Sequence, residues 1–127
     1  MKMRKALSLV LACMMALALV ACGDKGGTGN NASVKIGVIL VGDETEGYTT
    51  AHMEGIKEAA KQLGIADNQI IWKYKVHEDS TCYDAAVDLV GQGCSVVFSN
   101  SYGHQTYMVQ AAEAYPDVTF VSMTGDF

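Results

Sequence analysis

Acidic residues and an aromatic residue gather in one short stretch, GDETEGYTT at 42–50, directly after an apolar run. Carboxylates in such a stretch can act as acids or bases, bind a metal ion, or accept hydrogen bonds from a ligand. The acids Asp43 and Glu44 would repel phosphate, and the sequence has neither GxGxxG nor GxxxxGK[ST] at this place. We therefore consider Asp43, Glu44 and Thr49 as hydrogen-bonding candidates and Tyr48 as a ring that stacks on a flat ligand. The alternative interpretation is a solvated loop in which Tyr48 serves packing.

A second polar stretch, SNSYGH at 99–104, precedes a predicted helix. It combines hydroxyl groups, an amide and an aromatic ring with the free N–H groups that the start of a helix offers. Such a loop suits a neutral polar ligand, so Asn100, Ser101 and Tyr102 are further ligand-binding candidates. An ordinary helix-capping loop is the alternative interpretation.

Catalytic and metal chemistry are less well supported by the sequence. Ser101, His104 and Asp43 supply the residue types of a hydrolase triad, but no GxSxG motif accompanies them. The run HED at 77–79 is interpreted as an exposed polar turn rather than a metal cluster, and no Cys/His spacing resembles a zinc site. We predict no catalytic residue, no metal and no cofactor.

Predicted strands and helices alternate along the chain, as the spacing of the apolar residues indicates, and they position these loops. Apolar, β-rich runs predict strands at 34–41, 69–76, 95–98 and 118–122. Apolar residues at helical spacing predict three helices between them: one ending at Gly64, one opened by a capping box at 81–84, and one stopped by Pro116. This β-α-β-α-β-α-β order with right-handed crossovers predicts an α/β fold with a doubly wound parallel sheet.

In such a sheet, ligands bind beyond the carboxyl ends of the strands. Four segments are expected at that edge: 42–50, 77–80, 99–104 and 123–127. No helix follows the fourth strand, so its outer edge and faces are expected to lack a cover. We interpret the chain as an incomplete lobe, the N-terminal portion of a longer protein.

The N-terminal segment has the features of an export signal. Positive charges at Lys2, Arg4 and Lys5 precede an apolar run, and the run ends in LVAC at 19–22, the shape of a bacterial lipobox. We predict a lipoprotein signal peptide at 1–21, lipidation of Cys22, a glycine-rich tether at 22–33, and a domain at 34–127. The expected location is the extracytoplasmic face of the cell membrane.

The net charge narrows the class of partner, and the positions of the remaining cysteines argue against a disulfide. Three of the nine basic residues precede Cys22, so the rest of the chain carries six basic residues against 14 acidic ones, a formal net charge of −8. Nucleic acid is therefore not an expected partner. Cys82 and Cys94 fall at opposite ends of one predicted helix, too far apart for a disulfide, and are predicted to be buried thiols.

Four passages together resemble the basic-membrane-protein (PnrA-like) family of substrate-binding lipoproteins of ABC transporters. They are the lipobox with its tether, GVILVGDETEGYTTAHMEGIKEAAKQLGI at 37–65, DAAVDLVGQGCSVVFSNSYGHQTYMVQAA at 84–112, and YPDVTFVSMTGDF at 115–127. The resemblance implies the N-terminal lobe of a type I periplasmic-binding-protein fold, which closes over a small ligand. It further implies a purine nucleoside, with its base stacked on an aromatic ring and its ribose bound by carboxylates. Thr45 and Thr124 stand where the family commonly has acids, and Thr124 joins the ligand-binding candidates.

The expected function is that of a lipid-anchored substrate-binding protein that delivers a small polar ligand to an ABC permease, without covalent chemistry. Three alternatives stay open: a binding protein for a sugar or another small ligand, a ligand-sensing lipoprotein, and a tethered α/β hydrolase.

Overall fold

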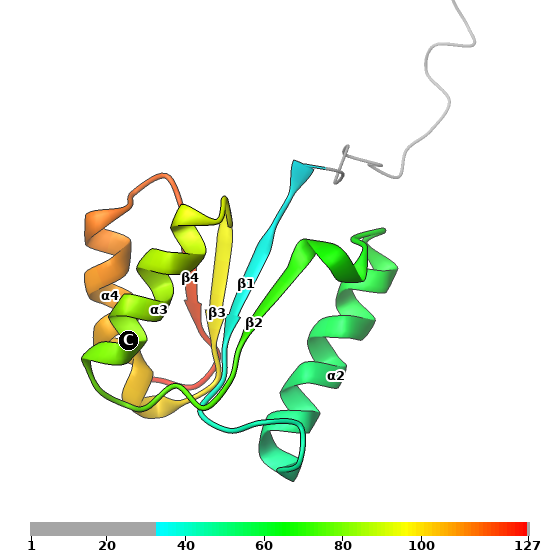
Figure 1. The fold of residues 1–127 in the computed structure, drawn as a ribbon, viewed down its shortest axis with the longest axis horizontal. Coiled ribbons are helices and arrows are strands. Elements are labelled where there is room, and N and C mark those ends of the chain that lie inside the picture. Colours follow the sequence, from blue (N-terminus) through cyan, green and yellow to red (C-terminus); the bar gives the residue numbers. More distant parts are fainter. Residues whose placement is uncertain (1–32, 127) are drawn as a thin grey trace, which may run out of the picture.

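The computed structural model describes residues 33–126, which form an α/β fold around a four-stranded sheet. All neighbouring strands are parallel, in the order β2-β1-β3-β4 (Figure 1). Their bounds are β1 Ile36–Ile39, β2 Ile70–Lys73, β3 Val96–Ser99 and β4 Thr119–Ser122. The fold class predicted from the sequence is confirmed. The predictions for the signal peptide, Cys22 and most of the tether fall outside the described residues.

Strands β1, β2 and β4 are shorter than the apolar runs that predicted them, because pairing is limited to four residues in each strand, whereas β3 has the predicted length and begins one residue later. The central strand β1 is buried along its whole length, as expected for a parallel strand covered on both faces. The edge strand β2 is half-buried after Ile70. This agrees with the alternation of apolar and polar residues after Ile71, which predicts that one face of this strand is wetter than those of β1.

Three α-helices connect the strands: α2 Gly47–Gln62, α3 Ser80–Gly91 and α4 Gln105–Ala114. Short 3₁₀ helices, η2 Asp67–Gln69 and η3 Tyr102–His104, precede β2 and α4. Helix α2 ends where the sequence predicts, since Gly64 takes a φ of +69° that favours glycine over other residues.

The predicted capping box at 81–84 is wrong. Helix α3 begins at Ser80, and Asp79 is its N-cap. The Asp79 carboxylate accepts hydrogen bonds from the Thr81 main-chain N–H at 2.9 Å and from the Thr81 hydroxyl at 2.6 Å. Thr81 thus donates its hydroxyl to the capping residue and does not cap the helix itself. These hydrogen bonds favour the ionised carboxylate, so they lower the pKa of Asp79.

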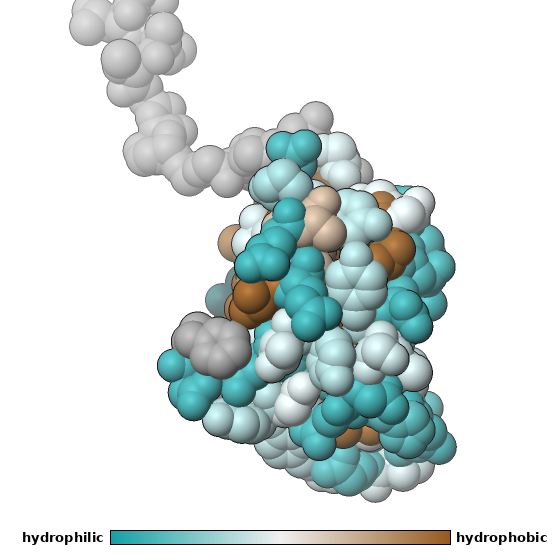
Figure 2. Space-filling model, turned by 90° about the vertical axis from the view of Figure 1, so that its left-hand side faces the viewer, coloured by the Kyte–Doolittle hydropathy of each residue, from teal (hydrophilic) through white to brown (hydrophobic). Residues whose placement is uncertain are grey.

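The helices form two layers on either side of the sheet. Helix α2 covers one face, and α3 with α4 covers the other (Figure 1). Two apolar clusters result, one around Ile39, Leu89 and Val97 and the other around Val38, Leu40 and Met53. Figure 2 shows a largely hydrophilic outer surface on the side of α4, with small hydrophobic patches.

Helix α2 leaves part of its face of the sheet open. An apolar groove of about 360 Å³ runs beside it, lined by residues such as Ile56, Leu63, Phe98 and Met123. The last strand, β4, is half-exposed or exposed at each residue. The expectation that the fourth strand is incompletely covered is therefore confirmed.

The two cysteines of the described domain are free and buried, as predicted. Burial raises the pKa of the Cys82 thiol to about 12 and also raises that of Cys94. No helix within residues 33–126 is long and apolar enough to cross a membrane.

Candidate ligand-binding site

The loops that follow the four strands gather at one edge of the sheet, at the lower end of the molecule in Figure 1. The strand order places β1 beside β3, with the connections from these two strands running in opposite directions along the sheet. This is the topological switch point at which doubly wound sheets bind ligands. The predicted site residues from three loops meet there.

Tyr48 lies in the first turn of α2, after the loop that follows β1. Its hydroxyl donates a hydrogen bond to the main-chain oxygen of Asn100, in the loop after β3. Its ring packs edge-on against His52 with a centroid separation of 4.6 Å, and the residue remains 45% exposed. Because the hydroxyl and one edge are engaged, the ring is held in place while part of its surface faces solvent.

Asn100 joins three of the loops from a fully buried position. Its side-chain oxygen accepts a hydrogen bond from the Val41 N–H at 2.9 Å, and its own N–H donates to the Ile39 oxygen at 3.1 Å. Its main-chain oxygen accepts from Tyr48 and from the Thr124 hydroxyl, the latter at 3.1 Å. Among the described groups, no partner is found for the Asn100 Nδ2. Asn100 therefore links the ends of β1, β3 and β4.

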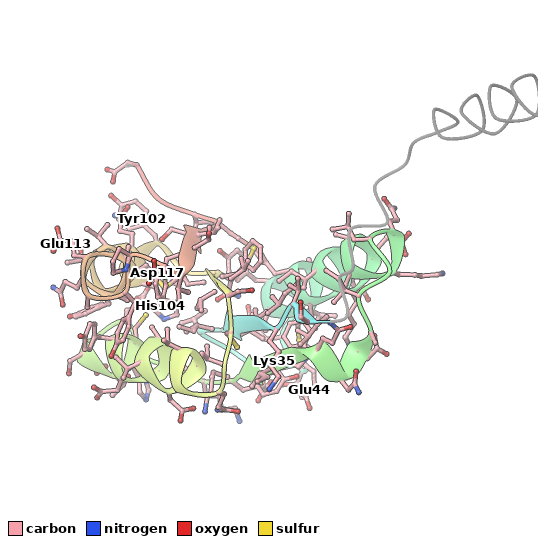
Figure 3. The ribbon with its side chains drawn as sticks, turned by 90° about the horizontal axis from the view of Figure 1, so that it is seen from above. Lys35, Glu44, Tyr102, His104, Glu113 and Asp117 are labelled. Carbon is pink, nitrogen blue, oxygen red and sulfur yellow. The ribbon has the colours of Figure 1, made fainter. Side chains whose placement is uncertain are left out.

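Tyr102 repeats the arrangement of Tyr48 one strand further along the sheet. It is 57% exposed, and its hydroxyl donates to the Asp126 carboxylate at 3.0 Å, in the segment after β4. Figure 3 shows Tyr102 and His104 together beside α4. Each of the two tyrosines thus extends from one loop and is hydrogen-bonded to the loop of the next strand.

The acidic residues of the loop after β1 differ in the contacts that their carboxylates make. Asp43 pairs with Lys75 at 2.7 Å and accepts from the Thr45 N–H at 2.9 Å. The ion pair and these hydrogen bonds hold the pKa of Asp43 far below its ordinary value. Glu46 accepts a hydrogen bond from the buried hydroxyl of Thr49 at 2.6 Å, so Thr49 supports the loop from inside.

The Glu44 side chain is exposed, and within the described part of the chain no hydrogen bond or ion pair engages its carboxylate. Its negative charge helps to raise the pKa of Tyr74 and of Lys75, which places it near both groups. Glu44 is thus an acceptor that a ligand can reach without breaking an internal contact.

Glu78 is a functional candidate that the sequence reasoning missed. It follows β2, and its Oε1 accepts hydrogen bonds from the Ser101 hydroxyl and from the Gly103 N–H, the latter at 3.0 Å. These hydrogen bonds, with a smaller contribution from His104, lower the pKa of Glu78. The only sequence signal was an acid shortly after a strand, which is also found in ordinary polar turns.

The described residues do not form the hydrolase triad of Ser101, His104 and Asp43 that was considered from the sequence. His104 is fully buried, and its Nε2 contacts the Val76 oxygen at 3.0 Å rather than Ser101. Burial lowers the pKa of His104. Ser101 donates to Glu78 instead, and Asp43 pairs with Lys75. For residues 33–126, no group of three or more His, Cys, Asp or Glu side chains is arranged to hold a metal ion.

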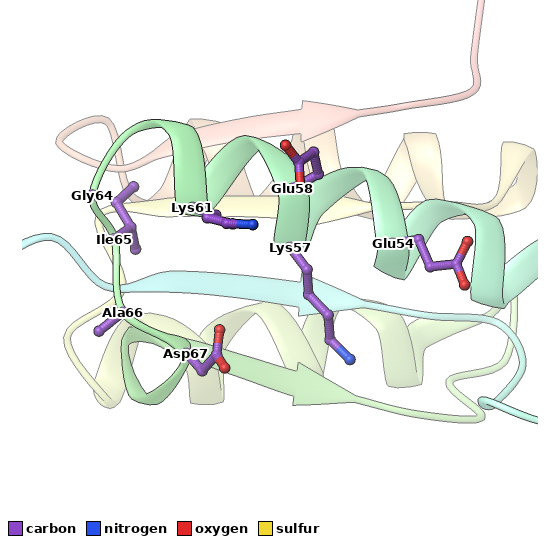
Figure 4. Close-up of a pocket in the computed structure, with 8 residues that line it drawn as sticks. All are labelled: Glu54, Lys57, Glu58, Lys61, Gly64, Ile65, Ala66 and Asp67. Atoms are coloured by element: carbon purple, nitrogen blue, oxygen red, sulfur yellow. The ribbon is translucent and has the colours of Figure 1, made fainter.

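An open hollow lies away from this edge, along the exposed side of α2 (Figure 4). It measures about 660 Å³ and is lined by alternating charges, among them Glu54, Lys57, Glu58 and Lys61. The Lys57 ammonium lies 5.7 Å from the centre of the Trp72 ring. This cation–π contact explains why the Lys57 side chain points towards Trp72. We interpret this hollow as a gap between exposed side chains and not as a ligand site.

Comparison with known proteins finds similar solved structures, and two of them are described here. One is an ABC transporter solute-binding protein from Conexibacter woesei DSM 14684, with a TM-score of 0.58 and 19% identity over 68% of this chain. The other is a transcriptional activator of the comK gene from Bacillus halodurans, with a TM-score of 0.61 and 22% identity over 72% of this chain. The matches cover only 28% and 30% of those two chains.

No family model matches the sequence, and no curated protein is significantly similar to it. The similarity to the two structures concerns the fold, since both identities are below 25%. The chain therefore has a Rossmann-like α/β fold, which it shares with a solute-binding protein of an ABC transporter and with a transcriptional activator.

Proposed function

We propose that the chain is the N-terminal part of an extracytoplasmic, lipid-anchored substrate-binding protein of an ABC importer. The observation that carries this proposal is the pair of exposed tyrosines, Tyr48 and Tyr102, at the carboxyl edge of the sheet. Each hydroxyl is hydrogen-bonded to a neighbouring loop. Anchored rings lose little conformational entropy when a ligand binds, so they make an efficient stacking surface.

The chemistry of the edge favours a ligand that donates hydrogen bonds. Glu44 offers a free carboxylate, and Asp126 offers the oxygen that Tyr102 does not use. An anionic ligand would be repelled by these groups. A purine nucleoside has a flat base that can stack on the tyrosine rings and a ribose whose hydroxyl groups can donate hydrogen bonds to these carboxylates. It is the ligand we propose. Asp43, Thr49, Asn100, Ser101 and Thr124 would support this surface mainly by fixing the loops around it.

Two further parts of the proposal rest on sequence. The lipobox at 19–22 supports an anchor at Cys22, and the resemblance to PnrA-like lipoproteins supports delivery to a permease. Replacing Cys22 by serine should abolish labelling with a radioactive fatty acid while leaving the domain folded.

Sensing is the second candidate function. One of the two similar structures is described as a transcriptional activator, so this fold alone does not separate a transport protein from a regulatory one. A permease that co-purifies with the membrane-anchored chain would support transport, whereas a co-purifying kinase would support sensing. Neither outcome affects the proposed ligand surface.

Isothermal titration calorimetry of the full chain tests the ligand. The panel contains adenosine, guanosine, free adenine, ribose and glucose. We expect heat from at least one nucleoside, a weaker response to adenine, and none from glucose. Heat from glucose alone would contradict the proposed stacking on Tyr48 and Tyr102.

A further inference from the structure

Glu78 connects two loops whose strands are not neighbours. It follows β2, and β1 lies between β2 and β3 in the sheet. Its carboxylate nevertheless reaches the loop after β3, where one oxygen, Oε1, accepts hydrogen bonds from both Ser101 and Gly103. The residue between these two donors is Tyr102. A single carboxylate oxygen therefore holds the chain on both sides of Tyr102.

Gly103 allows this contact by its lack of a side chain. A Cβ atom at Gly103 would lie 2.6–2.7 Å from the Cδ, Cβ and Oε1 of Glu78, closer than real Cβ atoms approach. The Glu78 side chain is thus packed directly on the Gly103 backbone. On the other side of Tyr102, the donor to Glu78 is the hydroxyl of Ser101, a residue that is only 8% exposed. Glu78 is an exposed residue, but its carboxylate is fixed by two donors from the loop after β3.

We propose that Glu78 is the positioning residue that fixes the Tyr102 ring at the ligand-binding edge. This inference rests on the proposed function. With the Tyr102 hydroxyl bound to Asp126 and the flanking backbone bound to Glu78, the ring is held at both ends. Glu78 itself makes no contact with the ligand and acts through Tyr102.

A reciprocal contact strengthens the link between the same two loops. His104, from η3, reaches back to the Val76 oxygen at 3.0 Å, two residues before Glu78. Among titratable groups, His104 faces Glu78, while His77 and Asp79 flank it along the chain. Burial lowers the pKa of His104, and the hydrogen bonds from Ser101 and Gly103 lower the pKa of Glu78 more than His104 does. The hydrogen bonds from Ser101 and Gly103 therefore dominate the environment of Glu78.

The contact itself is tested without any ligand, in the ¹⁵N-labelled full chain. The amide proton of Gly103 should shift as the pH falls through the pKa of Glu78, which lies below its ordinary 4.5. In Glu78→Gln this shift should vanish, while Glu113→Gln, which changes an exposed acid on α4, should leave it intact. If the chemical shift of the Gly103 amide proton does not change as Glu78 ionises, the proposal is overturned.

The positioning role is tested by a double-mutant cycle with adenosine as the probe. We expect Glu78→Ala to weaken adenosine binding about two- to twelvefold, the cost of immobilising one side chain on binding. In a Tyr102→Ala background the same change should have almost no effect, and Glu78→Gln, which keeps an acceptor oxygen, should retain most of the affinity. An equal loss in both backgrounds would overturn the proposal.

The two tests separate failure of this inference from failure of the proposed function. A wild-type chain that binds neither adenosine nor guanosine would contradict the proposed ligand. The Gly103 amide would still show whether Glu78 holds the Tyr102 loop.

Discussion

The Tyr48 hydroxyl donates a hydrogen bond to the main-chain oxygen of Asn100, joining the loop after β1 to the loop after β3. These strands lie side by side at the switch point of the sheet. The bond fixes an exposed aromatic ring at the place where doubly wound sheets bind ligands. Part of the ring still faces solvent, since Tyr48 is 45% exposed beside its contact with His52.

Replacing Tyr48 separates the roles of its ring and its hydroxyl. Tyr48→Phe should keep stacking and cost about 0.5–1.5 kcal/mol of stability, the usual net value of one hydrogen bond. Tyr48→Ala should in addition weaken nucleoside binding about 5- to 150-fold, since stacking of one base contributes about 1–3 kcal/mol. Urea denaturation and calorimetry measure the two effects. Equal losses of affinity in both variants would argue against stacking.

Asn100→Ala should destabilise the domain and not merely the loop. The Val41 N–H, which is bound to the Asn100 side chain, would lose its partner. A part-buried donor left unpaired costs about 1–3 kcal/mol. Gln110→Ala, an exposed change on α4, serves as the matched control in urea denaturation. Unchanged stability of Asn100→Ala would show that the three loops do not depend on this residue.

Asp43 makes a pH-dependent contribution to stability. Its folded pKa lies below the ordinary value of 3.8, so the folded state favours the ionised carboxylate. The contribution is therefore present above about pH 4 and is lost as the pH falls further towards the folded pKa. Asp43→Asn should lower the urea midpoint near neutral pH and match the wild type increasingly well at lower pH. Asp117→Asn, at an exposed site, should show no such convergence.

The two buried thiols should be protected from reagents. Cys82 is fully buried and Cys94 nearly so, and the pKa of each thiol is raised. Because the thiolate is the reactive form, a chain beginning after Cys22 should react slowly with Ellman's reagent when native. Both thiols should react rapidly in urea. Fast reaction of the native chain would place at least one thiol at the surface.

The sequence was sufficient to predict the fold because its signals were local. The apolar run around Val38 and the helical spacing of Met53 and Ala60 each identify one element without knowledge of the others. Pro116 and Gly64 mark helix ends by their own backbone preferences. The order of elements then limits the sheet to a few topologies, among which the structure has the order β2-β1-β3-β4.

The roles of individual site residues were less accessible. Tyr48 and Tyr102 lie at the carboxyl edge of the sheet, as expected, and their ligand-binding role stays a prediction. The partners of their hydroxyls lie 52 and 24 residues away. The buried position of Asn100 and the reach of Glu78 depend on how three loops meet, which no local pattern encodes. The choice of Asp79 over Thr81 as helix cap was ambiguous, because both residue types cap helices well.

The most direct test of the ligand-binding edge is the map of amide chemical-shift changes when adenosine is added to the ¹⁵N-labelled full chain. The largest changes should fall in the loops at 42–50, 99–104 and 123–126. Amides along the charged hollow of α2 at 54–67 should stay unchanged. Changes concentrated along α2, or in the apolar groove beside it, would contradict a ligand site at the carboxyl edge of the sheet.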